Sequence, residues 1–220
     1  MFAKEIISYY IPALKGKSSG DEALAQMDEF RCAHLPVVDK GKYHGIISEN
    51  EILDWEDSAL TFDKIKKTLI RPFVNVYSHV YEVISVVSEF QLTIVPVLDD
   101  KEEYIGMISL QDLAFAFSKI TNASAPGGVI ILEVNVRDYS LAQAAQIVES
   151  DNARILSSYL NNTSDSLRIE LVLKINKEDL SSIINSFMRY NYTVKASFHE
   201  SQFDEDIQRR YEQFMNYLNM

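Results

Sequence analysis

The chain has 220 residues, of which 47% are hydrophobic and 24% are charged, and its formal net charge is −11. This length and balance are typical of a globular chain with one large domain or two ordinary ones. Acidic side chains outnumber basic ones in both halves, so neither half offers the cationic surface that nucleic acid or an anionic membrane requires. We therefore expect no nucleic-acid partner and no membrane partner.

The sequence offers little for redox or metal chemistry. Cys32 is the one cysteine, so an internal disulfide is impossible, and no Cys/His cluster has the spacing of a zinc site. No apolar run reaches the ~18 residues of a membrane span, and the N-terminus lacks the residue order of a signal peptide. We therefore expect a cytoplasmic protein in which Cys32 is a small core residue.

An internal repeat organises the first half of the chain. At an offset of 60 residues, Phe30 aligns with Phe90 and Pro36 with Pro96. One extra residue in the turn at 99–103 changes the offset to 61, since turns tolerate insertions that strands do not. The aligned pairs after this turn are Gly45 and Gly106, Ile47 and Ile108, Ser48 and Ser109, and Glu51 and Asp112.

Each copy predicts the same elements: an extended segment, a helix, two strands joined by a charged turn, and a second helix. The strands are short and rich in Val, Ile and Tyr. In the first copy we expect these elements at 12–17, 20–30, 34–38 and 43–47, with the second helix opening at Ser48. In the second copy we expect them at 72–77, 80–90, 93–98 and 104–108, with the second helix opening at Ser109.

The motifs in the two copies resemble the core pattern of CBS domains. The first copy has Leu-Pro-Val-Val-Asp and then Gly-Ile-Ile-Ser-x-x-Glu, and the second has Val-Pro-Val-Leu-Asp and then Gly-Met-Ile-Ser-x-x-Asp. Two such matches at repeat spacing imply a tandem CBS pair, or Bateman module, over roughly residues 1–120. The resemblance implies one repeat at 1–62 and another at 63–122, packed into one compact disc.

The resemblance also implies an adenosine-containing ligand, such as AMP, ADP, ATP or S-adenosylmethionine, between the repeats. A carboxylate can accept hydrogen bonds from both ribose hydroxyls, and a hydroxyl at a helix start lies beside N–H groups that favour phosphate. By resemblance, Asp112 would hold the ribose and Ser109 would lie near the phosphate. Ile94 and Val95 would offer main-chain groups to the adenine.

Ser48 and Glu51 occupy the matching positions of the first copy, where the family more often has aspartate than the longer glutamate. A second interpretation uses the same atoms: both pairs are helix capping boxes, each contributing about 1 kcal/mol to stability with no ligand bound. Few cations are available for a phosphate. Those expected near the mouth of the cleft are Lys15, Lys17, His34, His44, Arg71 and His79.

After the turn-forming segment 123–128, which predicts a linker, the pattern changes. Periodicity predicts strand, helix, strand, strand, helix and strand between 129 and 198, the ferredoxin-like βαββαβ order. This segment, at 127–200, resembles an ACT-like domain such as follows CBS pairs in acetoin-utilisation-type proteins. The loop 137–140 lacks the glycine of amino-acid-binding ACT domains, so we expect dimerisation instead. Residues 201–220 predict an amphipathic helix.

The expected fold class is therefore α/β (α+β), and the expected function is regulatory. No phosphate-binding glycine loop, nucleophile elbow or metal cluster is present in the sequence, so we predict no catalytic residue, no metal and no required cofactor. We expect a bacterial homodimer that senses an adenosyl ligand and signals to a separate, unidentified protein. The alternative is a dimerising adaptor whose clefts stay empty.

Overall fold

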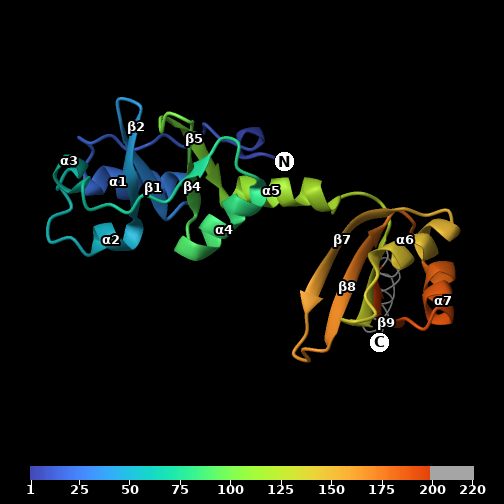
Figure 1. Cartoon of the computed structure of the whole chain (residues 1–220). Coiled ribbons are helices and arrows are strands. Elements are labelled where there is room, and N and C mark those ends of the chain that lie inside the picture. The colour runs from blue at the N-terminus through green and yellow to red at the C-terminus, as the bar shows by residue number, and fades with distance from the viewer. Residues whose placement is uncertain (199–220) are drawn as a thin grey trace, which may run out of the picture. The chain divides into compact units, whose positions relative to one another are not determined.

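The computed structural model describes residues 1–198 and separates the chain into two compact units. The N-terminal unit comprises Met1–Phe117, and the C-terminal unit begins at Ser118 (Figure 1). The helix predicted at 201–220 lies outside the described residues. Within residues 1–198, no helix combines the length and apolarity needed to cross a membrane.

The N-terminal unit contains the predicted repeat. A short 3-10 helix, η1 (Ala3–Glu5), precedes it. The first copy comprises α1 (Gly20–Phe30), β1 (His34–Asp39), β2 (Lys42–Ser48), α2 (Glu49–Leu53) and α3 (Phe62–Ile65). The second comprises β3 (Val74–Asn75), α4 (Val80–Phe90), β4 (Ile94–Leu98), β5 (Tyr104–Ser109) and α5 (Leu110–Thr121). Helices α1 and α4 occupy the predicted ranges, whereas the four-residue α3 was not predicted.

The two copies pair their strands in the same way. In the first, β1 and β2 are antiparallel with Pro36 opposite Ile46; in the second, β4 and β5 are antiparallel with Pro96 opposite Met107. Each hairpin has a register shift at the same place, after Val37 and after Val97. The extended segments that follow the prolines run parallel to β1, as a single bridge at Leu14, and to β4, as β3.

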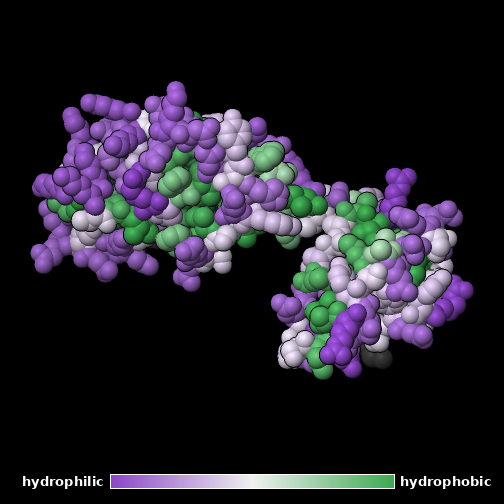
Figure 2. All heavy atoms as spheres, in the orientation of Figure 1, coloured by the Kyte–Doolittle hydropathy of each residue, from purple (hydrophilic) through white to green (hydrophobic). Residues whose placement is uncertain are grey.

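One hydrophobic core serves both copies. Leu35, Val37 and Ile47 from the first copy pack in the same cluster as Ile94 and Met107 from the second. The copies therefore fold as one body. The first copy extends this core through Trp55, whose ring lies 5.6 Å from that of Phe62. On the face shown in Figure 2, hydrophilic side chains cover much of this unit and hydrophobic ones are interspersed among them.

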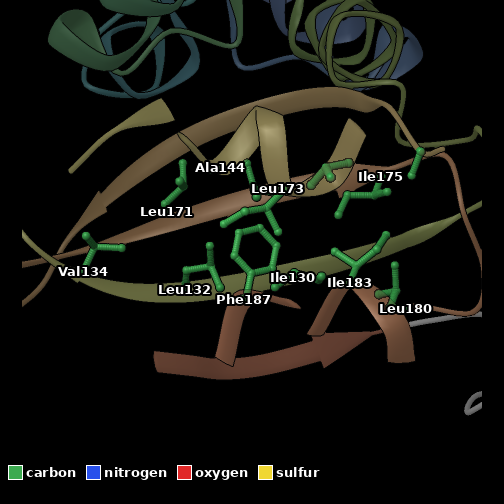
Figure 3. Packing of buried hydrophobic residues seen from close by; sticks show 13 residues of the cluster. Ile130, Leu132, Val134, Ala144, Leu171, Leu173, Ile175, Leu180, Ile183 and Phe187 are labelled. Carbon is green, nitrogen blue, oxygen red and sulfur yellow. The ribbon is translucent and has the colours of Figure 1, made fainter. Parts of the chain in front are cut away.

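The C-terminal unit has the predicted βαββαβ order. Its elements are β6 (Gly128–Asn135), α6 (Leu141–Ser150), β7 (Ile155–Asn162), β8 (Arg168–Ile175), α7 (Ser181–Arg189) and β9 (Thr193–Phe198). The sheet is antiparallel with the order β7-β8-β6-β9, which is the ferredoxin-like topology. Alternate residues of the central strands, such as Leu132 and Leu173, pack against α6 and α7, and Phe187 of α7 enters the same core (Figure 3).

The division between the units lies inside α5, between Phe117 and Ser118. The end of this helix is fastened to strand β7, because Ser157 Oγ donates to the carbonyl of Thr121 at 2.8 Å and Asn122 Nδ2 donates to that of Leu156 at 3.2 Å. The segment predicted as a linker forms the turn into β6. Gly127 is buried there with φ +130°, and a Cβ would lie 2.0 Å from the carbonyl oxygen of Ile175.

Candidate functional site

A cavity of about 370 Å³ opens at the first turn of α5 in the N-terminal unit. Segments far apart in sequence build its wall: the chain before α1, the end of α1, the residue before β4, and the first turns of α5. The lining residues are Ser8, Tyr10, Ile11, Phe30, Arg31, Cys32, Thr93, Ser109, Leu110, Gln111, Asp112 and Phe115. The predicted pair Ser109 and Asp112 therefore lies on a real concavity.

Ser109 and Asp112 contact each other through one carboxylate oxygen. Asp112 Oδ2 accepts from the Ser109 main-chain N–H at 2.9 Å and from its hydroxyl at 2.6 Å, while Ser109 Oγ accepts from the Asp112 N–H at 3.1 Å. This is the capping-box geometry that the sequence predicts. The second carboxylate oxygen, Oδ1, accepts no hydrogen bond from the described residues, so it is available to a ligand.

The aromatic part of the wall supplies flat apolar surface. The Tyr10 and Phe30 rings meet edge to face, with centroids 5.2 Å apart, and Phe115 lies one turn beyond Asp112 on α5 with 61% of its surface exposed. Together these rings give the wall contiguous aromatic surface. The cavity thus combines a free carboxylate oxygen with aromatic rings.

Thr93 joins this cavity to the first repeat. Its Oγ1 accepts from the Ala33 main-chain N–H at 3.0 Å and lies 3.1 Å from His34 Nδ1, and its own N–H donates to the same nitrogen at 3.3 Å. The main-chain carbonyl of Thr93 accepts from Leu110, the first residue of α5, at 3.1 Å. One residue therefore touches the cavity, the first repeat and the start of α5.

Burial shifts the titration of two groups near the cavity. Desolvation lowers the pKa of His34, and the charge of Glu51 opposes the shift by raising it. Desolvation also raises the pKa of the Cys32 thiol, against a main-chain hydrogen bond from His34. The thiol is therefore protonated at neutral pH, as expected of a small half-buried core residue rather than a nucleophile.

The first copy repeats the capping geometry without the same surroundings. Glu51 Oε2 accepts from the Ser48 N–H at 2.9 Å and from its hydroxyl at 2.7 Å. Glu51 is exposed, whereas Asp112 is half-buried. Ala33 occupies the position that Thr93 holds in the second copy, so the first copy lacks that hydroxyl. The longer Glu51 side chain makes the same capping contacts as Asp112. The two copies therefore differ in the residues that surround the cap.

The other predicted site residues lie behind or away from the cavity wall. Ile94 and Val95 have fully buried side chains and pair with Ser109 and Ile108 in the sheet, so they could meet a ligand only through main-chain groups, the role predicted for them. The six predicted cations lie outside the lining of this cavity. Arg31, in a left-handed conformation at the end of α1, lines it instead.

Sequence reasoning missed several wall residues, chiefly Tyr10, Arg31 and Thr93. Phe30 had a signal, because it recurs as Phe90 in the repeat. Thr93 had none, because its counterpart is alanine and only the packing of one copy against the other reveals its contacts. In the described part of the chain, no group of three or more His, Cys, Asp or Glu residues is arranged to hold a metal ion.

Two copies of a βαββα unit, packed around one core with a cleft at the second helix of one copy, define a tandem small-domain module. Residues 3–58 and 67–119 each match the family model described as the CBS domain. The chain belongs to the CBS domain family, and its N-terminal unit is a tandem CBS pair.

Solved structures of similar proteins include a CBS domain pair/ACT domain protein from Thermotoga maritima, with 23% identity over 54% of this chain and 98% of its own, and a TM-score of 0.48. CBSX2 in complex with AMP has 17% identity over 54% and 97%, with a TM-score of 0.45. The CBS domain of a bacterial CNNM/CorC family Mg2+ transporter in complex with ATP has 17% identity over 52% and 84%, with a TM-score of 0.42. These scores are low, so the family assignment rests on the family model.

Proposed function

We propose that the protein is a non-catalytic regulator that binds an adenine nucleotide or another adenosyl ligand in the cavity beside Asp112. The observation that carries the proposal is the combination found there: a carboxylate with one oxygen free, aromatic surface, and the start of a twelve-residue helix, all on a 370 Å³ cavity. The choice of ligand class is supported by the solved structures of CBSX2 in complex with AMP and of the CNNM/CorC-family CBS domain in complex with ATP.

Each part of an adenosyl ligand has a counterpart in the wall. Asp112 Oδ1 would accept from the ribose hydroxyls, and such charge-assisted hydrogen bonds are stronger than neutral ones. Tyr10, Phe30 and Phe115 would cover the adenine ring. Arg31 and the N-terminus of α5 would favour a phosphate. Because these are few positive groups, the cavity suits AMP, ADP or the cationic S-adenosylmethionine better than the more highly charged ATP.

Helix α5 carries Asp112 in its first turn. A ligand regulates only when it binds one arrangement of the protein better than another, so signalling requires that the bound and the empty cavity favour different arrangements of this helix. Homodimerisation, a cytoplasmic location and a separate target protein remain predictions that extend this proposal.

The alternative function is a dimerising adaptor with empty clefts. It is favoured by the capping boxes, which satisfy Ser48, Ser109 and one carboxylate oxygen each of Glu51 and Asp112 with no ligand present. In this case the pairs would contribute only stability.

Thermal unfolding with AMP, ADP, ATP and S-adenosylmethionine, each at millimolar concentration, separates the two functions. A ligand at 100 times its Kd adds about 2.7 kcal/mol to the stability of the folded state, which raises the midpoint by a few degrees. We expect a shift with at least one ligand in the wild type and none in Asp112→Ala.

Glu51→Ala is the matched control, since it breaks the equivalent cap in the first copy. Both variants lose a cap, so the comparison is between midpoints with and without ligand for each protein. A shift that survives in Asp112→Ala and disappears in Glu51→Ala would move the site to the first copy. No shift with any ligand would favour the adaptor.

A further inference from the structure

We infer that His34, a residue of the first repeat, is a positioning residue for the cavity of the second repeat: its neutral ring holds Thr93 in the cavity wall, and protonation of the ring breaks its hydrogen bond with the Thr93 main chain. The consequence for ligand binding rests on the proposed function. We call the contact between the neutral His34 ring and Thr93 the lock. It is a property of the unliganded protein and can be tested separately.

The hydrogen bonds fix the protonation state of the ring. The Thr93 main-chain N–H donates to His34 Nδ1, so this nitrogen is an acceptor and carries no proton. Thr93 Oγ1 accepts from the Ala33 N–H, so its single hydrogen is free to point to Nδ1, 3.1 Å away. The ring is therefore neutral, with its proton on Nε2. A proton on Nδ1 would face the Thr93 N–H and break that contact, and the contact with Oγ1 would then run in the opposite direction, from the ring to the hydroxyl.

A displacement of Thr93 would change the shape of the cavity. Its side chain lines the wall, and its carbonyl accepts from Leu110 at the start of α5. The next residue, Ile94, pairs with Ser109 in the sheet. Movement of Thr93 thus reaches both the wall and the turn that carries Asp112. The lock acts in one direction only, because Ala33 has no hydroxyl with which to build the reciprocal contact.

The surroundings of His34 decide when it titrates. Ser48 lies opposite it on β2, Cys32 lies two residues before it, and uncharged Thr93 faces it from the second repeat. Glu51, on α2, is the charged group that acts on the ring and favours protonation, but burial outweighs it and lowers the pKa. The lock is therefore intact above the ordinary histidine pKa of about 6.5, and it is lost as the pH falls through the lowered folded-state value.

The test compares AMP affinity of the full chain at pH 7.5 and at lower pH values in the wild type and four variants. His34→Asn keeps an acceptor oxygen near the Nδ1 position but cannot titrate, and His34→Leu removes the acceptor. Thr93→Val removes the hydroxyl while keeping the shape. His44→Asn is the matched control, because His44 lies in the same repeat on β2 and outside the cavity wall.

We expect the affinity of the wild type, relative to His34→Asn at the same pH, to fall as the pH drops through the His34 pKa and to level off at the several-fold deficit expected for His34→Leu. This ratio cancels the titration of the AMP phosphate, whose pKa is about 6. His34→Leu and Thr93→Val should bind several-fold more weakly even at pH 7.5, and His44→Asn should behave as wild type. A ratio that does not change with pH, or normal binding by His34→Leu, would overturn the inference.

Nitrogen NMR of the imidazole rings in the unliganded protein tests the lock without AMP. We expect a neutral His34 with its proton on Nε2 and a pKa below 6.5, shifted toward the ordinary value by Thr93→Val. A ring protonated on Nδ1, or a pKa indifferent to Thr93→Val, would refute the lock. If no protein binds AMP while the NMR result holds, the proposed ligand is wrong and the lock stands.

Discussion

At the scale of single residues, the same atoms serve stability and binding. Asp112 uses one oxygen to cap α5 and leaves the other exposed to the cavity. A capping carboxylate is already fixed in one rotamer by its own helix, so a ligand would lose less entropy in ordering it. The cap and the binding site are therefore compatible roles, and the pair Ser109 and Asp112 can carry both.

Tyr43 provides a prediction about a buried hydroxyl. It donates to the carbonyl of Pro72 at 2.9 Å, and burial raises its pKa well above the usual range for tyrosine. Tyr43→Phe leaves this buried carbonyl without its donor, so we expect a loss of about 1–3 kcal/mol in the free energy of unfolding, measured in urea.

Tyr104 is the natural control, because it occupies the equivalent position in the second repeat. Its hydroxyl makes no hydrogen bond with the described residues, although burial raises its pKa as well. Tyr104→Phe should therefore change the stability by less than about 0.5 kcal/mol. Equal losses in the two variants would show that the Tyr43 hydrogen bond contributes nothing specific.

At the scale of elements, the repeat allowed the elements common to both copies to be predicted. The features in which the two copies differ could not be predicted from it. The alternation of apolar residues and the duplicated Ser-x-x-acid motif predicted both hairpins and the helices that follow them. Helix α3 was missed because four residues give too little periodicity to recognise. Thr93 and Tyr10 were missed because contacts between the copies, and not local patterns, place them in the wall.

The two hairpin glycines predict a difference between equivalent positions. Gly45 has φ +150°, and a Cβ would lie 2.5 Å from Leu69 Cβ and 2.6 Å from the carbonyl oxygen of Ile70. A Cβ on Gly106 would meet the Ile7 Cγ2 methyl group at 2.5 Å, but the nearest main-chain atom, the Ser8 carbonyl oxygen, lies at 3.4 Å. We expect Gly45→Ala to cost at least about 2 kcal/mol and Gly106→Ala to cost less.

Urea unfolding of the two glycine variants measures this difference directly. The wild type and both variants should be compared under one condition, since the substitution adds the same methyl group in each. A Gly106→Ala variant as unstable as Gly45→Ala would mean that Ile7 cannot move aside. The order of the two losses is therefore the decisive result.

At the scale of the whole molecule, the sequence predicted two kinds of domain correctly. Changes in periodicity distinguished the tandem CBS pair from the ferredoxin-like unit that follows it. The turn formers at 123–128 marked the change of pattern, but α5 crosses the division earlier, between Phe117 and Ser118. A helix that crosses such a division has no compositional signature, because its residues are ordinary helix formers.

The contact between Trp55 and Phe62 has a spectroscopic consequence. Trp55 is the one tryptophan of the chain and packs in the core of the N-terminal unit. Its emission therefore reports the melting of that unit, whereas far-ultraviolet circular dichroism reports the helices and strands of both. Superimposable transitions by the two probes would show that the molecule unfolds as one cooperative system. Separate transitions would show that each unit has its own stability, and the fluorescence transition would then report how a ligand changes the stability of the N-terminal unit alone.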